Sequence, residues 1–217
     1  MTRPNPLVDH YRSLLDAHGD DARAVQYSDA ASQQARFARL ASVGRPLTSV
    51  LDVGCGLAHL CDYMRAHGWT GRYLGVDILP EFVDRARDRL AADPLADVQL
   101  LDAAAGALPE GCDYALLSGV FNNAMADNCG FMERTLRAMW AAAGKGIAFN
   151  AMSAHVDYRD AGLYYTDPAE VLRFCKVELG GHPVLWHDYV VRPGGFPFEY
   201  AVHLHKTPEF PAPPRLS

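Results

Sequence analysis

The sequence LDVGCGLAHL, residues 51–60, decides how the rest of the chain is interpreted. Its apolar start is of the kind that forms a buried strand of a parallel sheet. An acidic residue, Asp52, is followed by two glycines, Gly54 and Gly56, and residues 58–68 then have a helical pattern that ends at a glycine. A strand, a glycine turn and a helix in this order predict a backbone that approaches a nucleotide-like ligand closely.

Strand and helix patterns alternate along the rest of the chain. The last two strands are joined by only about six residues, RPGGFP, so they must be antiparallel, because a parallel connection needs a dozen or more. We therefore expect a doubly wound α/β fold: a mostly parallel seven-stranded sheet with a C-terminal antiparallel hairpin and N-terminal lid helices. The expected strands are 49–54, 73–78, 98–103, 113–120, 146–153, 184–191 and 198–206, and the expected helices are 6–18, 29–43, 58–68, 80–91, 131–144 and 167–180.

The organisation predicted from these patterns has three parts. Residues 1–46 form a helical lid, residues 47–206 form the Rossmann-like sheet domain, and the Pro-rich residues 207–217 form a flexible tail. Folds of this kind bind ligands at the carboxyl ends of the strands, near the point where the strand order reverses.

Composition limits the function classes. The chain has 217 residues, 49% of them hydrophobic, and a formal net charge of −6, so it has no general attraction for nucleic acid. Five cysteines without metal-ligand spacing predict reduced thiols. The N-terminal residues lack the apolar core of a signal peptide, and no apolar run approaches the roughly 20 residues that cross a bilayer. We expect a cytoplasmic protein without membrane contact.

A dinucleotide is the first ligand to consider for the glycine turn. The pattern GxGxxG requires a third glycine where this chain has His59, and the carboxylate of Asp52 would repel a pyrophosphate. Asp77 lies 23 positions after Gly54 at the end of the second strand. It can bind a ribose diol, but that fits any adenosine-type cofactor. An NAD-dependent oxidoreductase is therefore disfavoured.

The motifs resemble those of the class I S-adenosylmethionine-dependent methyltransferases. LDVGCGLA is similar to their first motif, acid-x-Gly-x-Gly-x-Gly, with Ala58 in place of the last glycine. YLGVDI at 73–78, LLDAAA at 100–105 and DYALLSGVFNN at 113–123 resemble the motifs of the next three strands, in order. The resemblance covers residues 28–206 and is nearest to small-molecule enzymes of bacterial biosynthetic pathways.

The resemblance implies a set of cofactor-binding residues. Asp77 would bind the ribose hydroxyls, and Ile78 would lie against the adenine. Asp102 would lie near the adenine amino group, with Ala103 offering a backbone amide. The methionine end of S-adenosylmethionine would lie against Asp52, Gly54, Gly56, Ser118 and Gly119.

One face of the 29–43 helix mixes polar and apolar side chains. Gln33, Arg36 and Phe37 share this face with Leu40. Either Gln33 or Arg36 could hold the carboxylate of the cofactor. The alternative is an ordinary amphipathic helix with Arg36 reaching water.

Methyl transfer from a sulfonium needs alignment of the acceptor and exclusion of water, with a base where the acceptor must lose a proton. His155, just beyond the fifth strand, is the candidate base. Asn122 and Tyr27 are further candidates for the acceptor side. A surface histidine and packing residues are the alternatives, and His187 is a second option for the base.

The sequence thus predicts methyl transfer from S-adenosylmethionine to an oxygen or nitrogen of a small molecule, as part of secondary metabolism. An aminopropyl-type transferase and a non-catalytic cofactor-binding module remain as alternatives. No metal is expected, because Asn150 and Asp157 are not backed by an acid after the fourth strand. The oligomeric state stays open, with a homodimer as one possibility.

Overall fold

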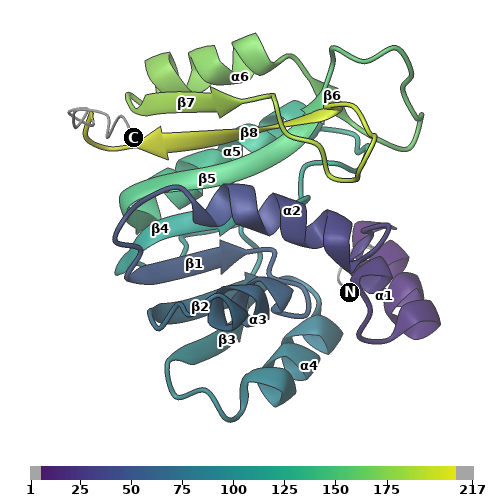
Figure 1. Ribbon diagram of the computed structural model, residues 1–217, viewed down its shortest axis with the longest axis vertical. Coiled ribbons are helices and arrows are strands. Elements are labelled where there is room, and N and C mark those ends of the chain that lie inside the picture. Colours follow the sequence, from purple (N-terminus) through teal and green to yellow (C-terminus); the bar gives the residue numbers. More distant parts are fainter. Residues whose placement is uncertain (1–5, 209–217) are drawn as a thin grey trace.

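The computed structural model describes residues 6–208, and the predicted tail lies outside this range from residue 209 onward. Within the described residues one sheet of eight strands has the order β3-β2-β1-β4-β5-β8-β7, with the short β6 beside β5 (Figure 1). The strands are β1 (Ser49–Val53), β2 (Arg72–Asp77), β3 (Ala96–Leu100), β4 (Cys112–Leu117), β5 (Ala143–Ser153), β6 (Tyr165–Thr166), β7 (His182–Trp186) and β8 (Glu199–His205).

The sheet is parallel from β3 to β5 and antiparallel at its C-terminal edge. β1 pairs in parallel with β2 and β4, while β8 runs antiparallel to both β5 and β7. The strand order therefore reverses between β1 and β4, which is where such folds bind ligands. The predicted doubly wound fold with its antiparallel hairpin is confirmed.

Helices cover both faces of the sheet because successive side chains of the buried strands point to opposite faces. Val50 packs with α2 and α3 on one face, and Leu51 and Val53 pack with α5 and the C-terminal helices on the other. In Figure 1, α2 lies in front of the sheet and α5 behind it. The helices are α1 (Pro6–His18), η1 (Ala22–Val25), α2 (Ala30–Ala41), α3 (His59–Ala66), α4 (Pro80–Leu90), α5 (Asn128–Ala142), α6 (Pro168–Arg173) and the π-helix η2 (Phe174–Glu178).

The N-terminal helices divide into two groups. α2 packs against β4, β5 and β8 as part of a sheet-covering layer. α1 instead lies beyond the carboxyl ends of the parallel strands (Figure 1), where Leu15 packs against Leu57, Leu79 and Phe82. The part of the chain that covers the ligand-binding edge is therefore α1 and η1.

The C-terminal hairpin differs in detail from the sequence prediction. β7 ends at Trp186, and the connection runs from residue 187 to 198, about twice the predicted length. The expected strand at 187–191 is wrong because this segment turns back over the sheet, where the Tyr189 hydroxyl donates to Glu199 Oε1 at 2.5 Å. The antiparallel pairing survives, since Trp186 lies opposite Ala201.

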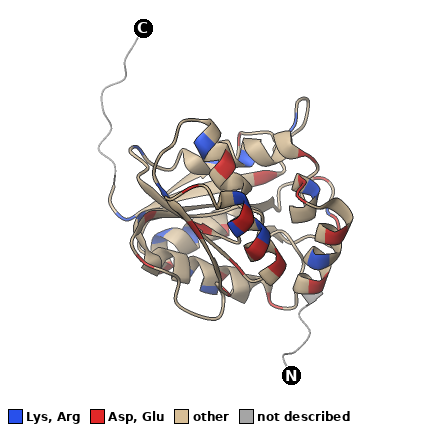
Figure 2. Cartoon of the chain, turned by 90° about the horizontal axis from the view of Figure 1, so that it is seen from below, with Lys and Arg blue, Asp and Glu red and all other residues tan. Residues whose placement is uncertain are grey.

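Charged residues of both signs are interspersed on the helices seen in Figure 2. Among residues 6–208, no helix is long and apolar enough to span a bilayer.

Candidate active site

The turn after β1 requires backbone conformations that glycine adopts without strain. Gly54 and Gly56 have φ values of 71° and 53°, in the left-handed region. A side chain on Gly54 would strike Val120, and a Cβ on Gly56 would lie 2.7 Å from Val25. Both the dihedral angles and the space therefore favour glycine at these two positions.

Ala58, which replaces the third glycine of the motif, adopts the same left-handed conformation. Its φ is 59° and its ψ is 27°, and it is the N-cap of α3. The side chain is fully buried against Cys61 and Val83. The chain thus keeps the glycine-type backbone at this position and uses the extra methyl group for packing.

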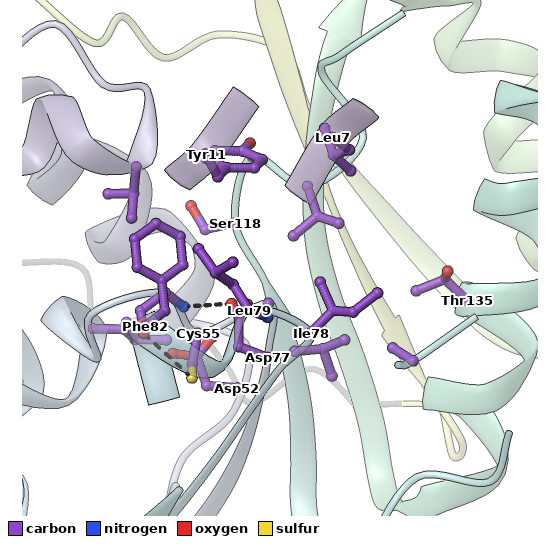
Figure 3. A pocket seen from close by; sticks show the side chains of 18 of the residues that line it. Leu7, Tyr11, Asp52, Cys55, Asp77, Ile78, Leu79, Phe82, Ser118 and Thr135 are labelled. Carbon is purple, nitrogen blue, oxygen red and sulfur yellow. Dashed lines mark hydrogen bonds between the residues drawn. The ribbon is translucent and has the colours of Figure 1, made fainter. Parts of the chain in front are cut away.

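A cavity of about 270 Å³ opens beside this turn, and we call it the glycine-turn cavity. In Figure 3, Leu7 and Tyr11 of α1 lie across it from Asp77 and Ile78. It collects most of the residues predicted to bind a cofactor: Gln33, Asp52, Gly54, Gly56, Asp77, Ile78, Asp102, Ala103, Ser118 and Gly119, together with Tyr27.

Asp77, at the end of β2, is buried beneath this cavity. Its Oδ2 accepts from the backbone N–H of Gly56 at 2.8 Å, and its Oδ1 accepts from that of Leu79 at 2.9 Å. Burial raises the pKa of this carboxyl, while these backbone hydrogen bonds lower it. The carboxylate therefore joins the glycine turn to the start of α4.

Asp52 is the second buried acid of the cavity. Its Oδ2 accepts a hydrogen bond of 2.6 Å from the hydroxyl of Tyr73 on β2. The pKa of Asp52 is raised to about 7, chiefly by burial; the Tyr73 hydrogen bond opposes this rise, and the neighbouring Asp77 adds to it. Three acids, Asp52, Asp77 and Asp102, and no Lys or Arg line this cavity among the described residues, an arrangement that favours a ligand with a cationic group.

The other end of the cavity is more open. Ile78 is 38% exposed, and Asp102 accepts from the backbone N–H of Ala104 at 2.9 Å. Thr135 of α5, which was not predicted from the sequence, also lines this end. Its buried Oγ1 has no hydrogen-bond partner in the described residues. A single hydroxyl on a core helix gives no signal in the sequence.

A group of polar side chains connects α1 and η1, which cover the ligand-binding edge, to the loop after β4. The Asn123 side chain donates to the Tyr11 hydroxyl at 3.0 Å and exchanges two hydrogen bonds of 3.0 Å with the Gln26 amide. Gln26 has a φ of 65° at the end of η1. Tyr11 and Gln26 were not predicted from the sequence, because their contacts with Asn123 join segments about a hundred positions apart.

A second cavity, of about 260 Å³, adjoins the first. The two share Tyr11, Val25, Tyr27 and Gly119 as lining residues. At this junction the Tyr27 hydroxyl lies 2.7 Å from Ser118 Oγ, and burial raises the pKa of Tyr27 to about 12. The Tyr27 hydroxyl is therefore protonated at neutral pH.

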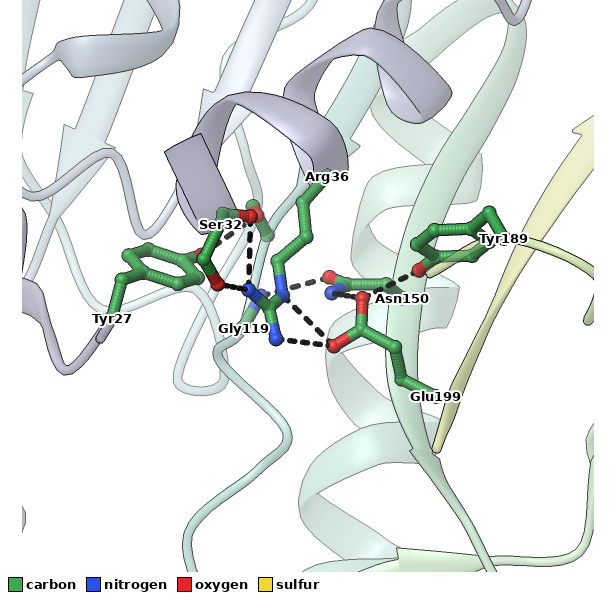
Figure 4. A network of polar contacts seen from close by, with 8 residues as sticks. Tyr27, Ser32, Arg36, Gly119, Asn150, Tyr189 and Glu199 are labelled. Carbon is green, nitrogen blue, oxygen red and sulfur yellow. Dashed lines mark hydrogen bonds and ion pairs between the residues drawn. The ribbon is translucent and has the colours of Figure 1, made fainter. Parts of the chain in front are cut away.

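Arg36 lines the second cavity and not the glycine-turn cavity. Its guanidinium contacts Glu199 Oε2 through Nε at 2.8 Å and Nη2 at 2.7 Å, and Nη1 donates to Ser32 (Figure 4). Both members of the ion pair are buried, with side-chain exposures of 7% and 1%. The cofactor-carboxylate role expected for Arg36 is not supported by this geometry, because Glu199 already neutralises the charge.

The other candidate residues of the acceptor side do not all lie in the cavities. Asn122 lines the second cavity, and its buried Oδ1 has no partner among the described residues. The His155 side chain is 64% exposed, and its Nε2 lies 3.7 Å from Asp167 Oδ1. His155 is not among the residues that line either cavity. His187 is also outside both. The structure therefore brings Asn122 and Tyr27 together and leaves the predicted base at the surface.

Comparisons with known proteins agree with this arrangement. Residues 51–149 match the family model of the methyltransferase domain. A protein of Mycobacterium tuberculosis (strain ATCC 25618 / H37Rv), named "Putative methyltransferase Rv1506c", is 34% identical over 148 residues, which cover 65% of this chain and 86% of that protein.

Solved structures share the fold. Magnesium protoporphyrin IX methyltransferase (ChlM) from Synechocystis PCC 6803, with bound S-adenosylhomocysteine, has a TM-score of 0.63 and 14% identity, covering 94% of this chain and 95% of its own. The glycopeptide N-methyltransferase MtfA, complexed with S-adenosylmethionine, has a TM-score of 0.62 and 15% identity, covering 84% and 96%.

Sheet order, glycine turn and cavity together define a class I methyltransferase fold. The chain belongs to the methyltransferase-domain family, and it is a methyltransferase.

Proposed function

We propose that this methyltransferase transfers the methyl group of S-adenosylmethionine to an oxygen or nitrogen atom of a small molecule, in the cytoplasm and as part of secondary metabolism. The observation that carries the proposal is the pair of adjoining cavities at the carboxyl ends of the strands. One has the size and residues for the cofactor, and the other has room for an acceptor.

The cofactor follows the glycine-turn cavity from end to end. Asp77 receives the ribose hydroxyls, and Ile78 lies against the adenine, which Asp102 and Ala103 border. The methionine end lies toward Asp52 and Gln33, along the turn of Gly54 and Gly56, and its sulfonium methyl lies toward Ser118 and Gly119. The ionised form of Asp52 complements the cationic ammonium and sulfonium groups.

The reaction is an in-line displacement. A lone pair of the acceptor atom forms a bond to the methyl carbon, the carbon–sulfur bond breaks, and its electron pair stays on sulfur as S-adenosylhomocysteine. The protein supplies alignment where the two cavities meet at Tyr27 and Gly119, and α1 and η1 act as the cover that excludes water.

Labelled methyl groups test this proposal. Full-length protein is incubated with methyl-labelled S-adenosylmethionine and a small-molecule extract of the native cell, and labelled products are identified by mass. We expect label on an oxygen or nitrogen of a small molecule. Label on a carbon or sulfur atom of the product would contradict the proposal.

A further inference from the structure

The second cavity has an uneven charge. Two arginines, Arg36 and Arg192, line it, and no Asp or Glu does so among the residues that the structure describes. This is unexpected for a chain with a formal net charge of −6. The acids nearest to the lining are engaged elsewhere: Glu199 pairs with Arg36, and Asp29 Oδ1 accepts from the Ser32 backbone N–H at 2.7 Å.

The two arginines play different parts. Arg36 is buried and neutralised by Glu199, which fixes it as part of the wall. Arg192 is exposed on the connection between β7 and β8, and it has no ion-pair partner within residues 6–208. The cavity therefore has one uncompensated positive charge, and this charge stands at its solvent side.

The inner part of the cavity offers hydrogen bonds instead of charge. The Asn122 amide lines it with an unpartnered Oδ1, and an unused buried acceptor of this kind needs a partner. The Tyr27 hydroxyl stands beside Gly119, where the cavity meets the glycine-turn cavity. Met152, Leu163 and Phe198 supply apolar lining between the two ends.

We infer that the second cavity selects a small molecule with an anionic group, a carboxylate or a phosphate, that pairs with Arg192, and with a hydroxyl or amine that Asn122 orients toward the cofactor. This inference rests on the proposed function, because it names the acceptor of that reaction. A hydroxyl or amine that donates its hydrogen to Asn122 Oδ1 points its lone pair away from Asn122. This leaves the lone pair free to face the methyl carbon, which lies toward Gly119. The proton of the acceptor passes to solvent water, since no His, Asp or Glu lines this cavity in the described chain.

Three matched probes test the charge preference. Full-length protein saturated with S-adenosylhomocysteine is titrated with 4-hydroxybenzoate, with its neutral isostere 4-hydroxybenzamide, and with the cation tyramine, and affinities are measured by calorimetry or saturation-transfer NMR. We expect 4-hydroxybenzoate to bind about threefold to tenfold more tightly than the amide, as for one exposed charge-assisted contact. Tyramine should bind most weakly.

Four variants assign the preference to residues. Arg192→Gln should abolish the difference between 4-hydroxybenzoate and 4-hydroxybenzamide, and Arg192→Lys should keep most of it. Asn122→Asp, which adds a negative charge without a change of size, should weaken 4-hydroxybenzoate more than the amide. Lys176→Gln removes an exposed cation that does not line the second cavity, and it should leave all three affinities unchanged.

The outcomes separate this inference from the function on which it rests. If wild-type protein fails to bind S-adenosylhomocysteine, the proposed function is contradicted, and the inference falls with it. Binding of S-adenosylhomocysteine with no preference for the anion, or with a preference that survives Arg192→Gln, overturns the inference alone. Failure of all three probes to bind the loaded protein also overturns it.

Discussion

The carboxylate of Asp77 accepts a hydrogen bond of 2.8 Å from the backbone N–H of Gly56. The acid that ends β2 is thereby tied to the glycine turn that follows β1, on the neighbouring strand. The residue proposed to bind the ribose also holds the turn proposed to approach the cofactor. One substitution should therefore affect both.

Asp77→Ala should weaken S-adenosylhomocysteine binding by roughly 1–3 kcal/mol, the usual cost of losing hydrogen bonds to a charged group. It should also lower the free energy of unfolding, because two buried N–H groups lose their acceptor. Calorimetry and urea denaturation measure the two effects. Asp88→Ala, at an exposed position of α4, is the control, and an Asp77 variant with the affinity of this control would place the ribose elsewhere.

Asp52 should make cofactor binding depend on pH. The pKa of its carboxyl in the protein is about 7, raised chiefly by burial, and the ammonium of the ligand favours the ionised form. Below pH 7 binding must first remove a proton, so affinity for S-adenosylhomocysteine should rise from pH 6 to pH 8. Calorimetry in two buffers of different ionisation enthalpy should detect proton release near pH 6.5, and Asp52→Asn should abolish it.

The same pKa shift has a consequence for stability. The folded protein holds this proton more tightly than the unfolded chain, whose Asp has a pKa of about 3.9. The contribution to stability is therefore full below about pH 4 and is lost as pH rises toward 7. Asp52→Asn should gain stability relative to the wild type as pH rises from 4 to 7 in urea denaturation. A constant difference across this range would mean that Asp52 titrates normally.

Tyr73→Phe should shift both pH profiles upward. The Tyr73 hydroxyl stabilises ionised Asp52 by its hydrogen bond of 2.6 Å, so its loss raises the pKa of that carboxyl. The midpoint of the pH dependence of S-adenosylhomocysteine affinity should move to higher pH. An unmoved midpoint would show that Tyr73 is only a packing residue.

Ala58→Gly should change stability little. Glycine relieves the left-handed strain, worth roughly 1–2 kcal/mol, but the variant loses a buried methyl group and gains entropy in the unfolded chain. We expect a change within about 1 kcal/mol in the free energy of unfolding. Ala86→Gly, equally buried but inside α4, should destabilise by about 1 kcal/mol or more. Equal losses in the two variants would contradict the assigned conformation of Ala58.

Glu199→Gln should be among the more damaging changes. It leaves the buried guanidinium of Arg36 without its counter-charge, at a cost of about 3–5 kcal/mol. The double variant Arg36→Met/Glu199→Leu should recover much of this loss, because it removes both charges. A loss below about 1 kcal/mol for Glu199→Gln in chemical denaturation would mean that water compensates the pair.

The sequence was informative where the signal is local. Gly54, Gly56 and Asp77 act through backbone turns and strand ends, and these features follow from a few adjacent residues. Ala58, the departure from the glycine motif, keeps the positive φ that glycine favours and adds a buried methyl group. The strands and most helices lie within a few residues of their predicted bounds for the same reason.

Contacts between distant segments could not be predicted in this way. Arg36 pairs with Glu199, 163 positions away, and the pattern of its helical face cannot predict such a partner. His155 stands just after β5, as predicted, but its side chain points to solvent. Asn123, which ties the loop after β4 to α1, had no local pattern that distinguished it from Asn122.

Whether the glycine-turn cavity binds S-adenosylmethionine is tested most directly by calorimetric titration of the full-length protein with S-adenosylmethionine, S-adenosylhomocysteine and NAD. We expect both sulfur compounds to bind at one site per chain and Asp77→Ala to weaken both, and we expect no competition from NAD. Binding of NAD without binding of either sulfur compound would contradict this expectation.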